Sequence, residues 1–252
     1  MKHQTNPPEF KTVREMLLYA FSTYATRIGV KVKEADDTVR DITFQTFGYD
    51  VFYAAEQIQQ YRGCHIGMLA GFSYAWLVFF CAVLITGNTA VLLNPDLSAQ
   101  ENAAKIKKAD ISLLLYDSHT LSIIQDCAET DSIAATDISS FAHAPEPRSP
   151  VPCDTTADDV CIILFTSGTT GESKAVQLSS ENLLNDLAGC FHLIGKVLNP
   201  DHPTTNMTVL PPYHAYQVTV CLFFQIAYGG CVCIAENVRY FAEDLKLSRR
   251  TV

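Results

Sequence analysis

The sequence predicts an α/β protein built on doubly wound, mostly parallel sheets flanked by helices. Strand-like and helix-like apolar patterns alternate from residue 65 to residue 136, as expected for parallel strands joined by helical crossovers. The run from Gly63 to Pro95 contains no Asp, Glu, Lys or Arg, which is typical of buried parallel strands and a covering helix. A third apolar run, Ile162–Phe165, ends in a loop rich in glycine and hydroxyl side chains.

The N-terminal segment predicts a helix, a strand and a second helix. Residues Thr12–Glu15 have the capping-box pattern, apolar residues then recur at helical spacing up to residue 28, and Gly29 ends the helix. Residues 40–45 alternate like a strand, and residues 49–61 return to helical spacing.

The next segment, residues 63–136, predicts strands and helices in strict alternation. Its uncharged part also raises the alternative of a membrane span, which needs about 20 consecutive apolar residues. Glycines and asparagines interrupt the run, so we expect a buried strand–helix–strand unit and no integral membrane protein. The expected elements are strands 65–70, 89–93, 111–116 and 132–136 and helices 73–85, 98–108 and 121–127.

A polar connector, residues 137–157, contains four prolines and separates two predicted sub-units, residues 1–136 and 158–252. After the glycine-rich loop, the second sub-unit predicts a short strand and a long helix, and then a strand–helix–strand unit. The expected elements are strands 175–178, 207–210 and 231–235, helix 180–194, and a helix that follows residues 211–214 and ends near Tyr228.

Composition and charge argue against several kinds of partner. The 252 residues have a net charge of −9, which disfavours a general binder of nucleic acid or of anionic membranes. Nine cysteines show no zinc-site spacing, so we expect reduced core thiols in a cytoplasmic protein. The polar stretch Met1–Glu15 contains no apolar segment of a secretory signal.

The loop that follows the apolar run 162–165 is the main candidate for a binding site. Its glycines let the backbone approach a ligand closely, and its hydroxyls and backbone N–H groups are hydrogen-bond donors. Lys174 adds a mobile positive charge. These groups suit a polyphosphate, although the loop matches neither the Walker pattern nor G-x-G-x-x-G, and an ordinary turn is the alternative. The candidate contacts are Thr166, Ser167, Gly168, Thr169, Thr170, Gly171 and Lys174.

The segment Asp158–Lys174 reads DDVCIILFTSGTTGESK and resembles the signature D-x-A-x-I-x-[FY]-T-S-G-[ST]-T-G-x-P-K of the adenylate-forming superfamily. That group includes acyl-CoA synthetases, luciferases and the adenylation domains of peptide synthetases. Ser173 replaces the usual proline. A second segment, Leu210–His214, is similar to the family's L-P-x-x-H motif, with Gln217 where a glycine usually follows. Residues 239–246 are most similar to the long-chain fatty-acid branch.

This resemblance implies the N-terminal part of the acyl-CoA synthetase-like fold and a two-step reaction. A carboxylate attacks the α-phosphate of ATP in the presence of Mg²⁺, pyrophosphate leaves, and coenzyme A accepts the acyl group. The motif match assigns the phosphates to the loop and Lys174, Mg²⁺ to Thr170, and the carboxylate end of the substrate to His214. We find no similarity to the family's later motifs or to its C-terminal lysine domain, so we expect this stretch alone to lack turnover.

Several alternatives stay open. Lys174 could be an ordinary surface lysine, His214 could cap the helix that follows it, and residues 218–226 could line an acyl channel or only pack in the core. The leading hypothesis is a long-chain fatty-acid CoA ligase. The alternatives are an adenylation domain that loads an amino or aryl acid onto a carrier protein, and a non-catalytic nucleotide- or partner-binding module.

Overall fold

The computed structural model describes residues 9–34, 36, 38–126, 133–167, 173–194, 204–208 and 210–234. The chain forms two compact units, one of residues 49–181 and the other of residues 1–48 together with 182–252. This division differs from the predicted sub-units 1–136 and 158–252. The difference arises because residues 160–179 join the sheet of the first half, while the N-terminal strand pairs with a strand near residue 232.

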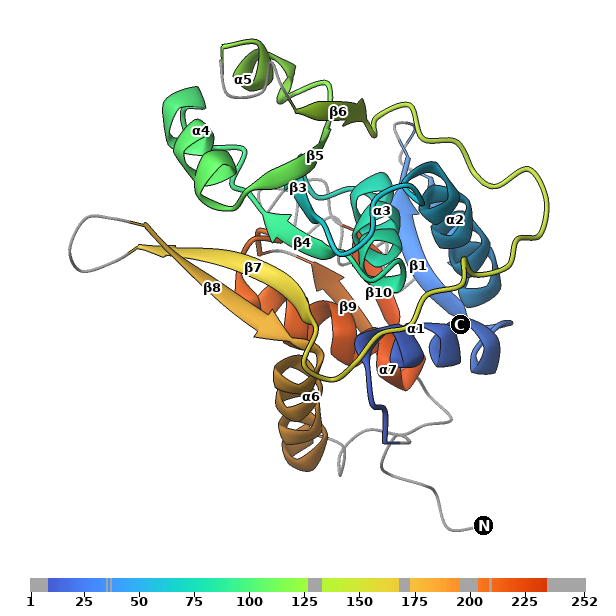
Figure 1. Ribbon diagram of the computed structural model, residues 1–252. Helices are drawn as coiled ribbons and strands as arrows, with labels where there is room; N and C mark the ends of the chain where they lie inside the picture. The colour runs from blue at the N-terminus through green and yellow to red at the C-terminus, as the bar shows by residue number, and fades with distance from the viewer. Residues whose placement is uncertain are drawn as a thin grey trace, which may run out of the picture. The chain divides into compact units, whose positions relative to one another are not determined.

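The unit of residues 49–181 contains a six-stranded sheet in the order β6-β5-β3-β4-β7-β8 (Figure 1). Five strands are parallel, and β8 at the edge is antiparallel to β7. This arrangement confirms the predicted doubly wound, mostly parallel fold. The strands are β3 (His65–Leu69), β4 (Thr89–Leu92), β5 (Ile111–Tyr116), β6 (Ala134–Asp137), β7 (Val160–Ser167) and β8 (Ser173–Ser179).

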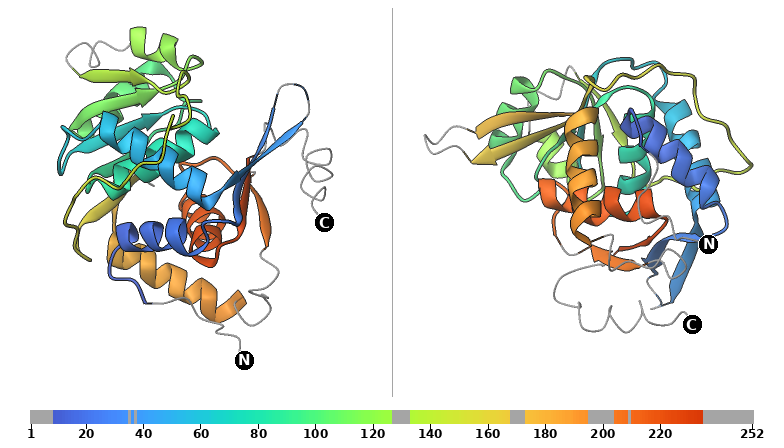
Figure 2. Two further views of the ribbon diagram at one scale, coloured as in Figure 1. Left: turned by 90° about the vertical axis from the view of Figure 1, so that its right-hand side faces the viewer. Right: turned by 90° about the horizontal axis from the view of Figure 1, so that it is seen from below.

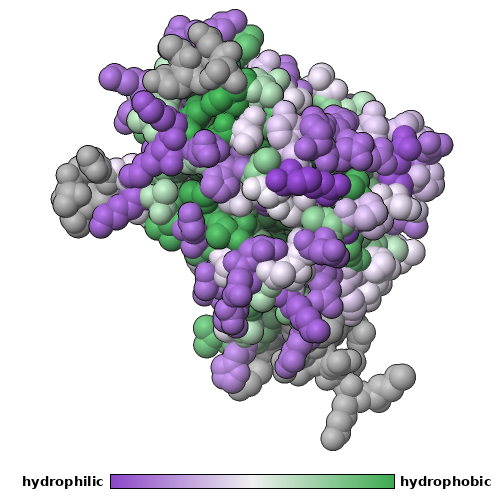
Figure 3. Space-filling view, in the orientation of Figure 1, coloured by the Kyte–Doolittle hydropathy of each residue, from purple (hydrophilic) through white to green (hydrophobic). Residues whose placement is uncertain are grey.

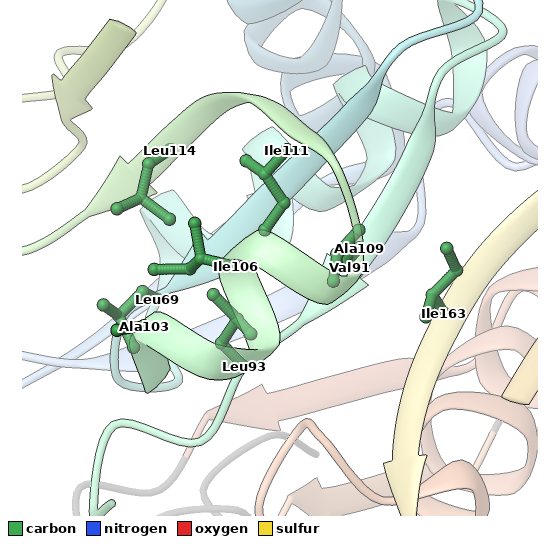
Figure 4. Close-up of a cluster of buried hydrophobic side chains, with 9 residues drawn as sticks. All are labelled: Leu69, Val91, Leu93, Ala103, Ile106, Ala109, Ile111, Leu114 and Ile163. Carbon is green, nitrogen blue, oxygen red and sulfur yellow. The ribbon is translucent and has the colours of Figure 1, made fainter. Parts of the chain in front are cut away.

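Helices α3 (Tyr74–Ile85) and α4 (Ala99–Lys108) cover opposite faces of this sheet. The chain moves from β3 to β4 in one direction and from β4 across to β5 in the other, so right-handed crossovers require opposite faces. On the α4 face, Ala103 and Ile106 pack on Leu69, Val91 and residues of β5 and β7 (Figure 4). The short helix α5 (Leu121–Gln125) packs against the same cluster.

Helix α3 explains the uncharged run of the sequence. Eleven of its twelve residues are buried, and Ser73 caps its first turn by accepting the N–H of Trp76. The Tyr74 hydroxyl donates to buried Asp50 at 2.6 Å, and Phe79 packs edge-on against Phe141 of the connector. Among the described residues, the longest apolar helices are too short to cross a bilayer.

The second unit contains a four-stranded sheet in the order β2-β1-β10-β9. Strand β1 is antiparallel to β2 and parallel to β10, and β10 is parallel to β9. The strands are β1 (Ile28–Lys33), β2 (Val39–Thr43), β9 (Thr205–Thr208) and β10 (Cys231–Ile234). Its helices are α1 (Val13–Thr23), the π-helix η2 (Gln217–Phe223) and α7 (Phe224–Tyr228). Two further helices, α2 (Phe44–Gln57) and α6 (Ser180–Ile194), cross the boundaries between the units at residues 48 and 181.

The main correction to the predicted elements concerns residues 24–33. The predicted first helix extended to residue 28, but α1 ends at Thr23 and β1 begins at Ile28. Gly29 belongs to this strand, where an added Cβ would lie 2.9 Å from the Phe44 ring. Pairing with β10 decides the conformation, and that partner is remote in sequence. The strand predicted at 40–45 also ends earlier, because α2 begins at Phe44.

Candidate functional site

The predicted phosphate loop joins β7 to β8, which form an antiparallel hairpin at the edge of the six-stranded sheet (Figures 1 and 2). Thr166 pairs with Lys174, and Ser167 pairs with Ser173. The predicted contacts Gly168, Thr169, Thr170 and Gly171 lie outside the described residues, and only the backbone of Ser167 is described. The structure therefore describes both stems of the loop.

Thr166 and Lys174 lie side by side on one face of the hairpin, because residues that pair across antiparallel strands point the same way. Both side chains are exposed. Phe165 lies on the opposite face, since it packs with Ile163 against the cluster under α4. A hydroxyl donor and an ammonium group are thus presented together, as binding of an oxyanion requires.

The loop leaves the carboxyl end of β7, the edge at which open α/β sheets bind ligands. Neighbouring loops at this edge are tied together by side chains. Asp117, which follows β5, accepts the N–H of Gly71, which follows β3, at 2.7 Å. The Thr120 hydroxyl donates to the carbonyl oxygen of Leu69 at 2.7 Å. These contacts could not be predicted from the sequence, because they join loops that are distant in the chain.

Helix α4 also contacts the stems of the loop, and local sequence patterns did not indicate these contacts. Lys108 Nζ donates to the Ser173 carbonyl oxygen at 2.6 Å, and Lys105 Nζ lies 5.5 Å from the centre of the Phe165 ring. Partial burial lowers the pKa of Lys105, and the nearby Glu101 carboxylate opposes that shift. The available signal was the run of lysines in the last turn of α4, a pattern that also occurs as simple compensation of the helix dipole.

The second motif, Leu210–His214, lies in the other unit and leads into the π-helix η2. The N–H of His214 donates to the Pro211 carbonyl, and the His214 carbonyl accepts the N–H groups of Gln217 and Val218. The imidazole is exposed, packs 5.0 Å from the Tyr213 ring, and has no hydrogen bond to a described side chain. Backbone bonds therefore make this turn, and the imidazole does not cap η2 within the described residues.

Gln217 stands where the family motif usually has a glycine, and its side chain is fully buried. Within the part of the chain that the structure describes, neither its carboxamide nitrogen nor its oxygen has a hydrogen-bond partner. By contrast, Gln225 in α7 accepts a hydrogen bond from Thr204 at 2.9 Å. An unpaired buried amide is destabilising, and π-helical turns often occur at functional sites.

The candidate metal ligand, Thr170, is outside the described residues. Among the residues that the structure describes, no cluster of three or more His, Cys, Asp or Glu side chains is placed to hold a metal ion. The eight described cysteines are free thiols, and five of them are buried: Cys81, Cys161, Cys221, Cys231 and Cys233. Burial raises the pKa of Cys231 to about 12.

Comparison with known proteins finds two groups of relatives. The hybrid PKS-NRPS synthetase iliA of Neonectria sp. is 30% identical over 190 residues, which cover 73% of this chain and 4% of the synthetase. The mouse long-chain-fatty-acid–CoA ligase 6 is 28% identical over 137 residues, 54% of this chain and 17% of the ligase. The chain thus spans a small part of the length of these relatives.

A solved structure has a similar fold. The inhibitor-bound N-terminal domain of FACL13 from Mycobacterium tuberculosis superimposes with a TM-score of 0.75 at 18% identity, over 94% of this chain and 60% of that domain. The sequence profile of the family described as "AMP-binding enzyme" matches residues 25–251. This match includes both loop stems and the Leu210–His214 turn, and the chain belongs to the AMP-binding enzyme family of adenylate-forming proteins.

Proposed function

We propose that this chain is part of an enzyme that uses ATP to activate a carboxylic acid as an acyl adenylate and then transfers the acyl group to a thiol. In its most specific form, the proposal is an acid–thiol ligase that joins a long-chain fatty acid to coenzyme A. The paired Thr166 and Lys174 at the carboxyl edge of the sheet carry this proposal.

The charge of the reaction determines the role of the loop. Pyrophosphate leaves with several negative oxygens, and donors fixed in place before the reaction stabilise that charge. Lys174 and Thr166 are paired and leave the hairpin from the same face, so an ammonium group and a hydroxyl can both reach the β- and γ-phosphates of ATP. The proposal extends the same role to Ser167, Gly168, Thr169, Thr170 and Gly171.

Mg²⁺ belongs to the proposal as a partner of ATP. The described groups at the stems are the Thr166 hydroxyl and the Lys174 ammonium, and both suit phosphate oxygens. In this proposal the metal ion is therefore held by the nucleotide and by Thr170. The bound ion would supply positive charge beside the phosphate oxygens.

His214 is proposed to orient the carboxylate of the acid. Its backbone is held at three points by Pro211, Gln217 and Val218, while the imidazole stays exposed. A neutral imidazole can donate from one nitrogen and accept at the other, so it can hold a carboxylate before the attack and the acyl phosphate afterwards.

A second candidate is an adenylation domain that loads an amino or aryl acid onto a carrier protein. The match to a hybrid synthetase supports this alternative. The buried Gln217 amide close to the His214 turn also supports it. A polar side chain next to the turn suits an acid with polar groups better than a purely apolar surface would.

ATP–pyrophosphate exchange with the full-length gene product tests the proposal. We expect exchange that depends on one class of acid in a panel of fatty, amino and aryl acids. Coenzyme A or a phosphopantetheine-bearing carrier is then added, and formation of a thioester with one of the two separates the ligase from the carrier-loading enzyme. If no acid supports exchange, the enzymatic proposal is wrong and a non-catalytic nucleotide- or partner-binding module takes its place.

A further inference from the structure

The loop stems extend beyond the support of the parallel sheet. Strand β4 pairs with β7 only from Ile162 to Leu164 and ends at Leu92. Among the described strands, the last residues of β7, 165–167, and the first residues of β8 therefore have only each other as partners. An isolated two-stranded hairpin is marginally stable in water, so this end of the hairpin needs another support.

Helix α4 provides that support, because one of its lysines lies on each stem. Lys105 lies over the ring of Phe165 in β7, and Lys108 donates to the carbonyl oxygen of Ser173 in β8. Figure 3 shows hydrophilic side chains over the part of the surface where α4 approaches the hairpin. Both lysines thus act on the hairpin and not only on the carbonyl groups of their own helix.

The contacts come from the face of the hairpin opposite to Lys174. Phe165 packs toward the cluster under α4, and strand alternation places Thr166 and its partner Lys174 on the other face. Lys108 consequently holds the backbone immediately before Lys174 and leaves the phosphate-facing side free. This geometry fits a support and does not fit a second direct ligand of the phosphates.

Helix α4 is itself held rigidly at its other end. Ser98 and Glu101 form a complete capping box, and the Asn102 amide donates to the carbonyl groups of Asn94 and Leu97. Ile106 is buried in the cluster on the sheet. A lysine presented from such a fixed element can position a loop better than a lysine on another loop.

We propose that Lys108 is a positioning residue for the phosphate loop, fixing the Ser173 carbonyl and through it the direction of Lys174. The inference rests on the proposed role of the loop in binding ATP. Lys107 is the matched control: its side chain is exposed in the same turn and makes no hydrogen bond or ion pair with a described residue.

Amide hydrogen exchange of the 252-residue chain tests the contact without any ligand. Lys108→Met should speed amide exchange in residues 173–176. Lys108→Arg should leave exchange unchanged, because arginine keeps a charged donor. Lys107→Met should also leave it unchanged. Equal protection in Lys108→Met and the unaltered chain would overturn the inference, whether or not the full-length protein adenylates an acid.

Kinetics of ATP–pyrophosphate exchange with the full-length gene product test the consequence. Loss of one exposed charge-assisted bond should raise the KM for ATP about three- to tenfold in Lys108→Met, with the KM for the acid unchanged. Lys108→Arg should restore most of the loss. Equal effects of Lys107→Met and Lys108→Met would show that only bulk charge matters, and the positioning role would be wrong. Absence of exchange in the unaltered protein would refute the proposed function, while the hydrogen-exchange result still decides the contact.

Discussion

The two motif-bearing segments of this protein are built in different ways. The β7–β8 stems are strands with a defined register, supported from one side by the lysines of α4. The Leu210–His214 turn is held by backbone hydrogen bonds, its imidazole is exposed, and an unpaired buried amide follows it. Under the proposed function, the stems contact the polyphosphate, which is common to all reactions of this kind, and the turn contacts the acid, which differs between them.

The π-helix belongs to the less constrained segment. In its wider turn, backbone carbonyl groups need additional hydrogen-bond donors, and side chains supply them. The Thr219 hydroxyl donates to the Ala215 carbonyl, and the Asn206 amide donates to the Cys221 carbonyl. We therefore expect substitutions at the stems to alter the use of ATP, and substitutions in the turn to alter the use of the acid.

The largest expected effect is that of Lys174→Ala on adenylation. Removing one preorganised charge donor typically lowers a rate by about 10²- to 10³-fold, and we expect a loss of that size in ATP–pyrophosphate exchange. Lys174→Arg keeps the charge and should retain part of the activity. An unchanged exchange rate in Lys174→Ala would mean that Lys174 does not contact phosphate in the transition state.

A smaller effect is expected for His214→Ala. Loss of an orienting hydrogen bond should lower kcat/KM for the acid about tenfold, equivalent to about 1.4 kcal/mol, and leave the KM for ATP nearly constant. His192→Ala is the control, because His192 is exposed near the end of α6. If His214→Ala raised only the KM for ATP, the proposed division between the two segments would be wrong.

Gln217→Met tests the unpaired amide in the 252-residue chain. Methionine has a similar length and needs no hydrogen bond, so the free energy of unfolding should rise by about 1 to 2 kcal/mol. The control is Gln225→Met, which removes the bond from Thr204 and should lower stability. Urea denaturation measures both. A less stable Gln217→Met chain would show that the amide is satisfied in solution.

Ser98→Ala should have the smallest effect. It removes the N-terminal cap of α4, which typically costs about 1 kcal/mol or less. Because α4 supports the loop stems, hydrogen exchange should increase in residues 173–176 and stay constant at residues 210–216. Ser140→Ala in the exposed connector is the control. Faster exchange at 210–216 would contradict the separation of the two segments.

Local sequence patterns predicted the strands β3, β4 and β5 well, because they are short apolar runs with clear ends. They did not place β7 and β8 in the same sheet. The strand at 65–69, the helix at 74–85 and the capping box at Ser98 all follow from neighbouring residues. At the loop, the patterns predicted strands only at 162–165 and 175–178, whereas β7 continues to Ser167 and β8 begins at Ser173. The pairing of Thr166 with Lys174 then follows from the hairpin register.

Features that depend on distant residues could not be predicted. Strand β1 was not predicted, because Val30 finds its partner Val232 only in the folded chain. The contact from Lys108 to Ser173 joins residues 65 positions apart, and the lysines alone indicate only a solvated helix end. The lack of hydrogen-bond partners for the Gln217 amide among the described residues likewise could not be predicted, because it depends on how the core packs.

The parallel pairing of β1 with β10 has a consequence for synthesis of the chain. The unit of residues 49–181 is continuous and can begin to fold while the polypeptide is still being made. Strand β1 must wait about 200 residues for its partner, roughly 10 to 40 s at ordinary translation rates. During that time its edge is available for wrong partners, so chaperone dependence and aggregation of the nascent protein should originate at residues 28–33.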